Sequence, residues 1–116
     1  MLNGDECIHL VTEAIKMGYR HIDGAEAYGN DKEIGIAIRR VIDDSIVSRK
    51  DLFIANKISD PTNAGYYGTK NLVKHQLETM GLEYFDLYMI HSPMQVGVSF
   101  EYIVFHCFNM FNYMCM

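Results

Sequence analysis

Apolar residues recur every three or four positions in residues 5–17, 31–43 and 67–80, which is the spacing of helices with one buried face. Asn3 or Asp5 is placed to cap the first helix, and Asn30 or Asp31 the second. Gly18 and Gly81 suit the positions where the first and third helices end. In the first helix, two sets of apolar residues stand at helical spacings: Ile8, Val11 and Ile15, and Leu10, Ala14 and Met17. The expected apolar stripe of the second helix is Ile34, Ala37, Ile38, Val41 and Ile42, and the expected inner side of the third is Leu72, Val73, Gln76, Leu77 and Met80.

Three short segments alternate with these helices and are typical of strands: YRHID (19–23), LFIANK (52–57) and DLYMIH (86–91). Strands that alternate with amphipathic helices predict an α/β fold with a parallel sheet and right-handed crossovers. A doubly wound sheet and a (β/α)8 barrel both fit this order. No Gly-x-Gly-x-x-Gly motif follows a strand, which lowers the weight of the doubly wound interpretation.

Length and composition limit the function classes. The 116 residues suffice for one modest domain, and the net charge of −5 with no Lys/Arg run argues against nucleic-acid binding. The three cysteines and the acidic N-terminus favour a reducing, cytoplasmic setting without a secretory signal. His9, His75 and His106 show no spacing with Cys or carboxylates that predicts a metal site.

Each expected strand ends on a polar side chain: Asp23, Lys57 and His91, at equal intervals along the chain. Alternate strand residues share a face, so counting back from each end predicts that all three point to one side. In a barrel, this side is the interior at the carboxyl-end rim, where barrel enzymes keep their active sites. Tyr28, in the loop after the first strand, is expected to lean over the same place.

These four side chains have compatible chemistry. Asp23 and Lys57 can neutralise each other, and a cation beside a phenol favours loss of the phenolic proton. Tyr28 is then a candidate general acid, with His91 as a hydrogen-bond donor to the same substrate oxygen. Such a set protonates an oxygen that gains negative charge, and a reduction would need hydride from a cofactor. Each residue alone has an ordinary structural explanation, and it is the joint placement that favours catalysis.

Other polar residues near these positions are expected to be structural. His21 shares the inward parity of Asp23 but sits deeper, and Asn56 faces the opposite way from Lys57. Arg20 and Glu26 are interpreted as ordinary surface or loop charges.

The stretch GYRHIDGAEAYGND, the strand LFIANK and the segment LETMGLEYFDLYMIHSP closely resemble the aldo-keto reductase family over about residues 8–93. The resemblance implies a catalytic tetrad of Asp23, Tyr28, Lys57 and His91, with Asp23 also contacting the cofactor. It further implies NADP(H) as cofactor and a small aldehyde or ketone as substrate, reduced to an alcohol. Three positions depart from the family pattern, with Gly24 in place of Thr, Asp31 in place of Glu and Ser92 in place of Trp.

A full barrel needs ~250 residues, so we expect residues 1–93 to form a partial, truncated (β/α)8 TIM barrel of about three strand–helix units. Residues 94–116 do not resemble the family and are interpreted as a divergent apolar tail. Its polar residues argue against a membrane span. The sequence leaves two hypotheses open. The first is a reductase whose truncated chain we expect to be inactive alone, and the second is a non-catalytic barrel fragment that binds or assembles. An open barrel exposes unpaired strand edges at both ends, which would make self-association possible.

Overall fold

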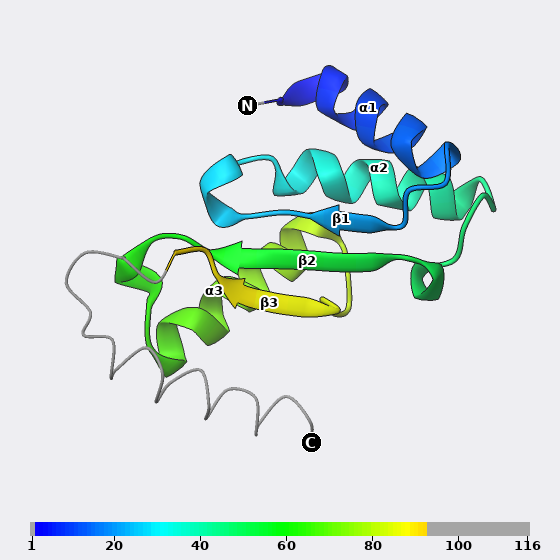
Figure 1. The fold of residues 1–116 in the computed structure, drawn as a ribbon. Coiled ribbons are helices and arrows are strands. Elements are labelled where there is room, and N and C mark those ends of the chain that lie inside the picture. Colours follow the sequence, from blue (N-terminus) through cyan, green and yellow to red (C-terminus); the bar gives the residue numbers. More distant parts are fainter. Residues whose placement is uncertain (1, 93–116) are drawn as a thin grey trace.

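The computed structural model describes residues 2–92, and the tail expected at 94–116 lies outside them. Helices and strands alternate along this part of the chain (Figure 1). Their bounds are α1 (Gly4–Lys16), β1 (His21–Asp23), α2 (Asp31–Asp43), β2 (Phe53–Ile58), α3 (Tyr66–Met80) and β3 (Leu87–Ile90). Short 3-10 turns lie between them: η1 (Glu26–Tyr28), η2 (Arg49–Asp51) and η3 (Pro61–Asn63).

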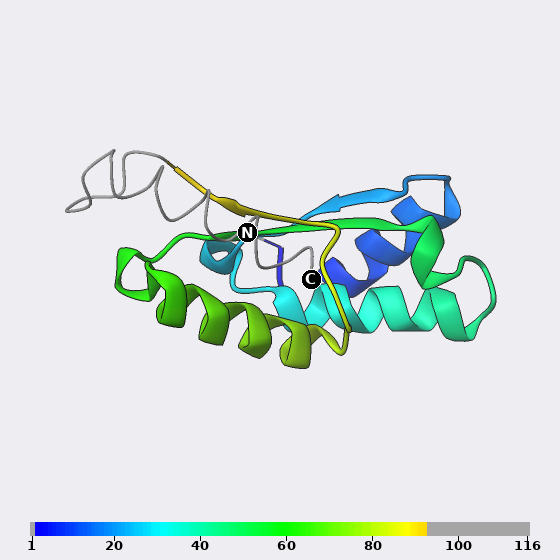
Figure 2. The same cartoon turned by 90° about the horizontal axis from the view of Figure 1, so that it is seen from below.

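The strands form a parallel sheet in the order β1-β2-β3. All three helices lie on one side of it, and the opposite face is left open by the described residues (Figure 2). A doubly wound sheet carries helices on both faces, whereas consecutive strands with helices on one side form an arc of a (β/α)8 barrel. The structure therefore confirms the predicted partial barrel.

The core lies between the sheet and the helices. Ile34, Ala37, Ile38 and Val41 of α2 are buried, as the helical pattern predicted. Ile34, Ile38 and Val41 belong to the same apolar cluster as Ile54 of β2. Gln76 and Met80 form the most buried part of α3, with Leu72, Val73 and Leu77 partly buried beside them. Together with Ile15 of α1, these side chains join the three helices to one face of the sheet.

The predicted bounds of α2 match the structure, but β1 is shorter than the predicted 19–23. Tyr19 is largely exposed, and the Arg20 guanidinium donates hydrogen bonds to the carbonyls of Ile15 and Tyr19. The predicted N-cap positions are correct for two residues, but the predicted capping hydrogen bonds are not formed. Asn3 and Asn30 occupy the cap positions, yet neither side chain makes a capping hydrogen bond. The Asn30 amide instead donates to the carbonyl of Leu2 and to Cys7 Sγ, which ties α1 to the start of α2.

A chain of polar side chains runs through the packed side of the sheet. The Asp31 carboxylate accepts hydrogen bonds from Asn56 Nδ2 at 3.0 Å and Gln76 Nε2 at 3.1 Å. The Tyr88 hydroxyl donates to Gln76 Oε1 at 2.7 Å, and burial raises its pKa, so it stays protonated. Buried polar groups are costly unless paired, and here each partner satisfies the next. As predicted, Asn56 faces away from Lys57 and is fully buried.

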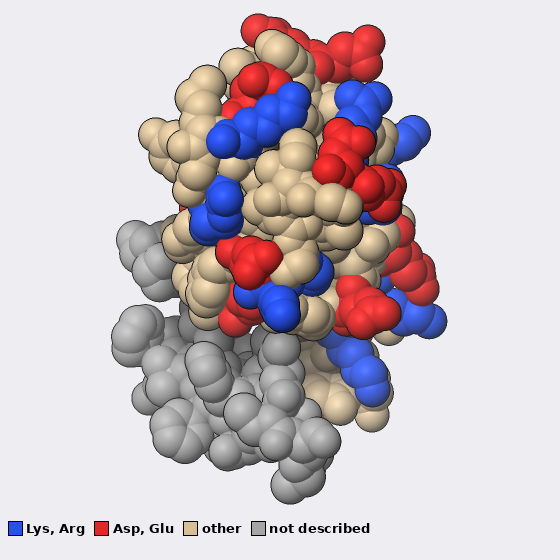
Figure 3. Space-filling model, turned by 90° about the vertical axis from the view of Figure 1, so that its right-hand side faces the viewer, with Lys and Arg blue, Asp and Glu red and all other residues tan. Residues whose placement is uncertain are grey.

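Charges at the amino-terminal ends of the strands are mixed in sign. Figure 3 shows Lys and Arg side chains interspersed with Asp and Glu on this face. One pair there is Arg49 with Asp86, at 2.8 Å. None of the helices formed by residues 2–92 has the length and apolar character to cross a membrane.

Gly35 provides a test of the contact between α2 and α3. A Cβ at this position would overlap the backbone of Met80. Gly→Ala within a helix normally stabilises by up to ~1 kcal/mol. Because rigid backbone cannot move aside easily, we expect Gly35→Ala to lower the free energy of unfolding by about 1–3 kcal/mol. Urea denaturation of the chain measures this, with Lys32→Ala, on the exposed side of the same helix, as control. A stabilised Gly35→Ala variant would contradict the close contact.

The buried carboxyl group of Asp31 should make the stability of the fold depend on pH. Burial raises its pKa above the ordinary value of 3.8, despite the two amide hydrogen bonds. The folded state then binds this proton more tightly than the unfolded state. Its stabilising contribution is fully present below the unfolded pKa and is lost as the pH rises through the folded pKa. The free energy of unfolding of the wild type minus that of Asp31→Asn should therefore fall as the pH rises above about 4. Urea titrations at a series of pH values test this, and a constant difference would refute it.

Candidate active site

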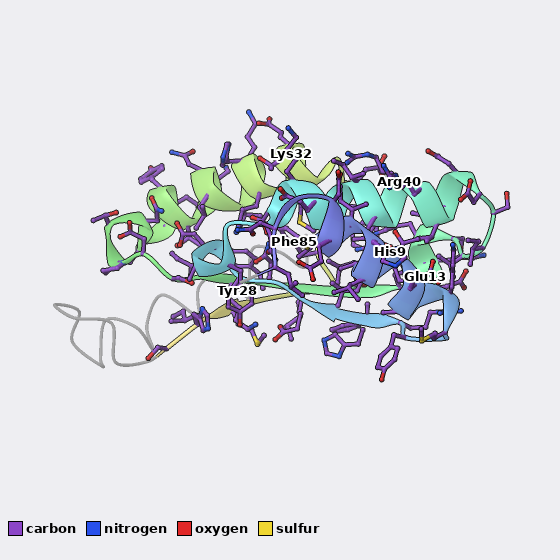
Figure 4. The ribbon with its side chains drawn as sticks, turned by 90° about the horizontal axis from the view of Figure 1, so that it is seen from above. His9, Glu13, Tyr28, Lys32, Arg40 and Phe85 are labelled. Carbon is purple, nitrogen blue, oxygen red and sulfur yellow. The ribbon has the colours of Figure 1, made fainter. Side chains whose placement is uncertain are left out.

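The carboxyl ends of the strands bring the four predicted site residues together. Asp23 ends β1, Lys57 lies near the end of β2, and His91 follows β3, where its N–H still donates to the carbonyl of Ile58. Tyr28 is the last residue of η1 and is half-buried. Figure 4 shows Tyr28 at the strand ends beside this turn, while Phe85 lies between the sheet and the helices.

The strand register explains why these side chains share a face. Asp23 pairs with Ala55 and Lys57 pairs with Met89, so each site residue lies two positions beyond the partner of the preceding one. An even offset preserves the side of a pleated strand. The equal intervals in the sequence therefore correspond to a constant register, and the predicted parity is confirmed for both strand pairs.

Lys57 is the centre of the group. Its ammonium lies 2.6 Å from Asp23 Oδ2 and donates to the carbonyl of Gly24 at 3.0 Å. Only 11% of the Lys57 side chain is exposed, against 53% for Asp23. A buried ammonium needs a carboxylate and hydrogen bonds to offset its desolvation, and the strand ends supply both.

Two aromatic contacts complete the cluster. The Lys57 ammonium lies 5.6 Å from the centroid of the Tyr28 ring, within the range of a cation–π interaction. The rings of Tyr28 and His91 meet edge to face, with centroids 5.5 Å apart and planes at 88°. A phenol, an ammonium and an imidazole therefore lie close together on the open side of the sheet.

Glu26 has a structural role that the sequence did not reveal. Its Oε2 accepts hydrogen bonds from the N–H groups of Ser59 and Asp60, at 2.7 and 2.8 Å, and its Oε1 accepts from Asn63 Nδ2 at 2.6 Å. The interpretation of Glu26 as an ordinary loop charge was therefore wrong. Its carboxylate joins the turn that carries Tyr28 to the loop after β2. No local pattern points to this role, because the donors come from a distant loop.

In the described part of the chain, His21, Cys7 and the other possible metal ligands lie apart from the catalytic candidates or form no site. His21 shares the face of Asp23 but is exposed, and its ring meets that of Phe53 edge to face with centroids 4.9 Å apart. Within residues 2–92, no group of three His, Cys, Asp or Glu side chains is arranged to hold a metal ion. Cys7 is buried, which raises the pKa of its thiol, and it lies on α1 rather than at the strand ends.

The polar cluster lies at the carboxyl ends of the strands, which is where (β/α)8 barrel enzymes have their active sites. The family model "Aldo/keto reductase family" matches residues 2–105, and the chain belongs to this family. The match extends beyond residue 93, where we expected the likeness to end, so the boundary between the two predicted segments stays a prediction.

Curated relatives agree with this membership. The chain is 43% identical over 99 residues to an NADPH-dependent aldose reductase of Saccharomyces cerevisiae, covering 85% of this chain and 29% of the relative. It is 44% identical over 97 residues to an NAD(P)H-dependent D-xylose reductase of Pyricularia oryzae, covering 84% and 28%. The chain therefore spans about three tenths of the length of these relatives.

Solved structures show the same relationship. An aldo/keto reductase from Brucella melitensis superposes with a TM-score of 0.78 at 34% identity, covering 97% of this chain and 39% of that one. A Bombyx mori aldo-keto reductase in complex with NADP gives a TM-score of 0.70 at 35% identity, covering 74% and 28%. These neighbours also support the arc of a barrel over the doubly wound alternative.

The Glu26 contacts generate a stability prediction. Glu26→Gln keeps the shape but replaces one acceptor oxygen with an amide donor, which leaves backbone N–H groups or Asn63 without an acceptor. We expect a loss of about 1–3 kcal/mol in the free energy of unfolding. Amide hydrogen exchange at Ser59 and Asp60 should accelerate as well. Glu83→Gln, an exposed glutamate outside this cluster, is the control. Unchanged exchange in Glu26→Gln would show that the carboxylate does not hold the loop.

Proposed function

We propose that this chain carries the catalytic residues of an NADP(H)-dependent aldo-keto reductase, which reduces an aldehyde or ketone to an alcohol. The observation that carries the proposal is the grouping of Lys57, Asp23, Tyr28 and His91 at one end of the sheet. Family membership supports the reaction class.

The proposed roles follow from the contacts. Tyr28 donates a proton to the carbonyl oxygen as that oxygen gains negative charge. Lys57, 5.6 Å from the phenol ring centroid, favours the phenolate that remains. Asp23 holds the ammonium in place through the 2.6 Å ion pair. His91 donates a hydrogen bond to the same carbonyl oxygen and orients it.

The reduced nicotinamide cofactor supplies the hydride when bound. Asp23 is the proposed contact to it on this chain, and its carboxylate is suited to this because half of the side chain stays exposed beside the ion pair. Gly24, where the family usually has Thr, has little spare room, since a Cβ there would lie 3.3 Å from Asn56 Oδ1. The cofactors named for the relatives, NADPH and NAD(P)H, support this assignment.

The proposed substrate class is a small carbonyl compound, in line with the aldose and xylose reductases among the relatives. Cytoplasmic placement stays a prediction from the sequence. The chain spans about three tenths of the length of those relatives, so the reductase activity and the substrate class are proposals.

An alternative function is a non-catalytic barrel fragment that binds or assembles. The observation in its favour is the open sheet face, on which Phe53 is 42% exposed and Asp23 and His21 are also exposed. In a closed barrel, this face would be filled by side chains of the remaining strands.

Turnover separates the two functions. The assay follows NADPH oxidation with 4-nitrobenzaldehyde, comparing the wild type with Tyr28→Phe. Loss of the phenolic proton should lower the rate by about 10²–10⁴-fold, the usual contribution of a general acid. Tyr84→Phe, a tyrosine at the opposite end of the sheet, is the matched control and should keep its rate. A wild type that binds NADPH but does not turn over would favour the non-catalytic fragment, as would failure to bind NADPH.

A further inference from the structure

Ser59 contacts the imidazole of His91. Its hydroxyl oxygen is 2.8 Å from His91 Nδ1, a hydrogen-bond distance between residues that follow neighbouring strands. The backbone N–H of Ala27 donates to the same oxygen at 3.3 Å. Ser59 therefore connects the turn that carries Tyr28 to the imidazole that faces Tyr28.

The state of the imidazole decides whether His91 can perform its proposed role. A neutral imidazole carries its proton on one ring nitrogen only, and the hydrogen bond at the other nitrogen selects which one. Ser59 engages Nδ1, so Nε2 is the nitrogen available to a substrate. Nε2 donates to a carbonyl oxygen only if it bears the proton.

We propose that Ser59 is a positioning residue that donates its hydroxyl hydrogen to His91 Nδ1 and thereby holds the imidazole as the Nε2–H tautomer. The Ala27 N–H occupies one lone pair of the serine oxygen, which favours directing the hydroxyl hydrogen toward the imidazole. The direction of hydrogen bonding is then Ala27 to Ser59 to His91. This inference rests on the proposed reductase function and assigns that site a further residue.

Two other contacts hold this arrangement. The Ser59 N–H donates to Glu26 Oε2 at 2.7 Å, which fixes the backbone from which the hydroxyl projects. The edge-to-face contact with Tyr28 restrains the plane of the His91 ring. The imidazole is therefore held at Nδ1 by Ser59 and through its ring by Tyr28, and Nε2 is the nitrogen left for a substrate.

The test is NMR of the histidine ring nitrogens in the full ¹⁵N-labelled chain, at alkaline pH where imidazoles are neutral. Long-range ¹H–¹⁵N correlation distinguishes the two tautomers, and His91→Gln assigns the signals. In the wild type, we expect His91 to be almost entirely the Nε2–H form. In Ser59→Ala, the Nδ1–H form should rise severalfold. Ser59→Thr, which keeps the hydroxyl, should restore the wild-type pattern.

Thr62→Ala is the matched control, because it removes an exposed hydroxyl from the same loop. The Thr62 hydroxyl donates a hydrogen bond to Asp60 and not to His91. It should leave the His91 signals unchanged. A predominant Nδ1–H form in the wild type overturns the inference even if Ser59→Ala fails to fold. An unchanged tautomer in a folded Ser59→Ala variant, checked by circular dichroism, also overturns it. This measurement is independent of turnover, so its failure is distinguishable from failure of the reductase proposal.

Discussion

The register of the parallel sheet is the constraint on which the site depends. Each site residue lies two positions beyond the partner of the one before it, so Asp23, Lys57 and His91 lie on the same side of the sheet. A shift of one residue would turn a site residue into the packed layer. The ion pair between Asp23 and Lys57 is thus a consequence of backbone pairing that is fixed by the apolar residues on the other face.

The two faces of the sheet have different chemistry. The packed face holds the aliphatic core and a satisfied chain of polar groups in which Asp31 links Asn56 to Gln76. The open face carries the reactive residues, of which Lys57 alone is buried. Because the hydrophobic core lies on one face of the sheet, charged residues can occupy the other face. The buried Lys57 ammonium is tolerated there because it forms an ion pair with Asp23 and a hydrogen bond to the Gly24 carbonyl.

Much of this could be predicted from the sequence, because regular patterns reflect regular structure. The apolar stripe of α2 fixed its bounds, and the parity of the strand ends predicted which side chains would meet. Contacts between loops were beyond reach, since nothing in the local sequence shows that Glu26 meets Ser59 or that Asn30 bonds to Leu2. The length of β1 was overestimated because alternation continues into Tyr19, whereas the pairing of β1 with β2 begins at His21.

The carboxylate of Glu26 has an evolutionary consequence. Two of its three donors are main-chain N–H groups, which exist whatever residues stand at positions 59 and 60, whereas the third is the Asn63 side chain. Substitution at position 63 should thus track substitution at position 26 among descendants of this chain. The link between the two loops does not depend on the side chains at 59 and 60, although the Ser59 hydroxyl is also within hydrogen-bond distance of His91.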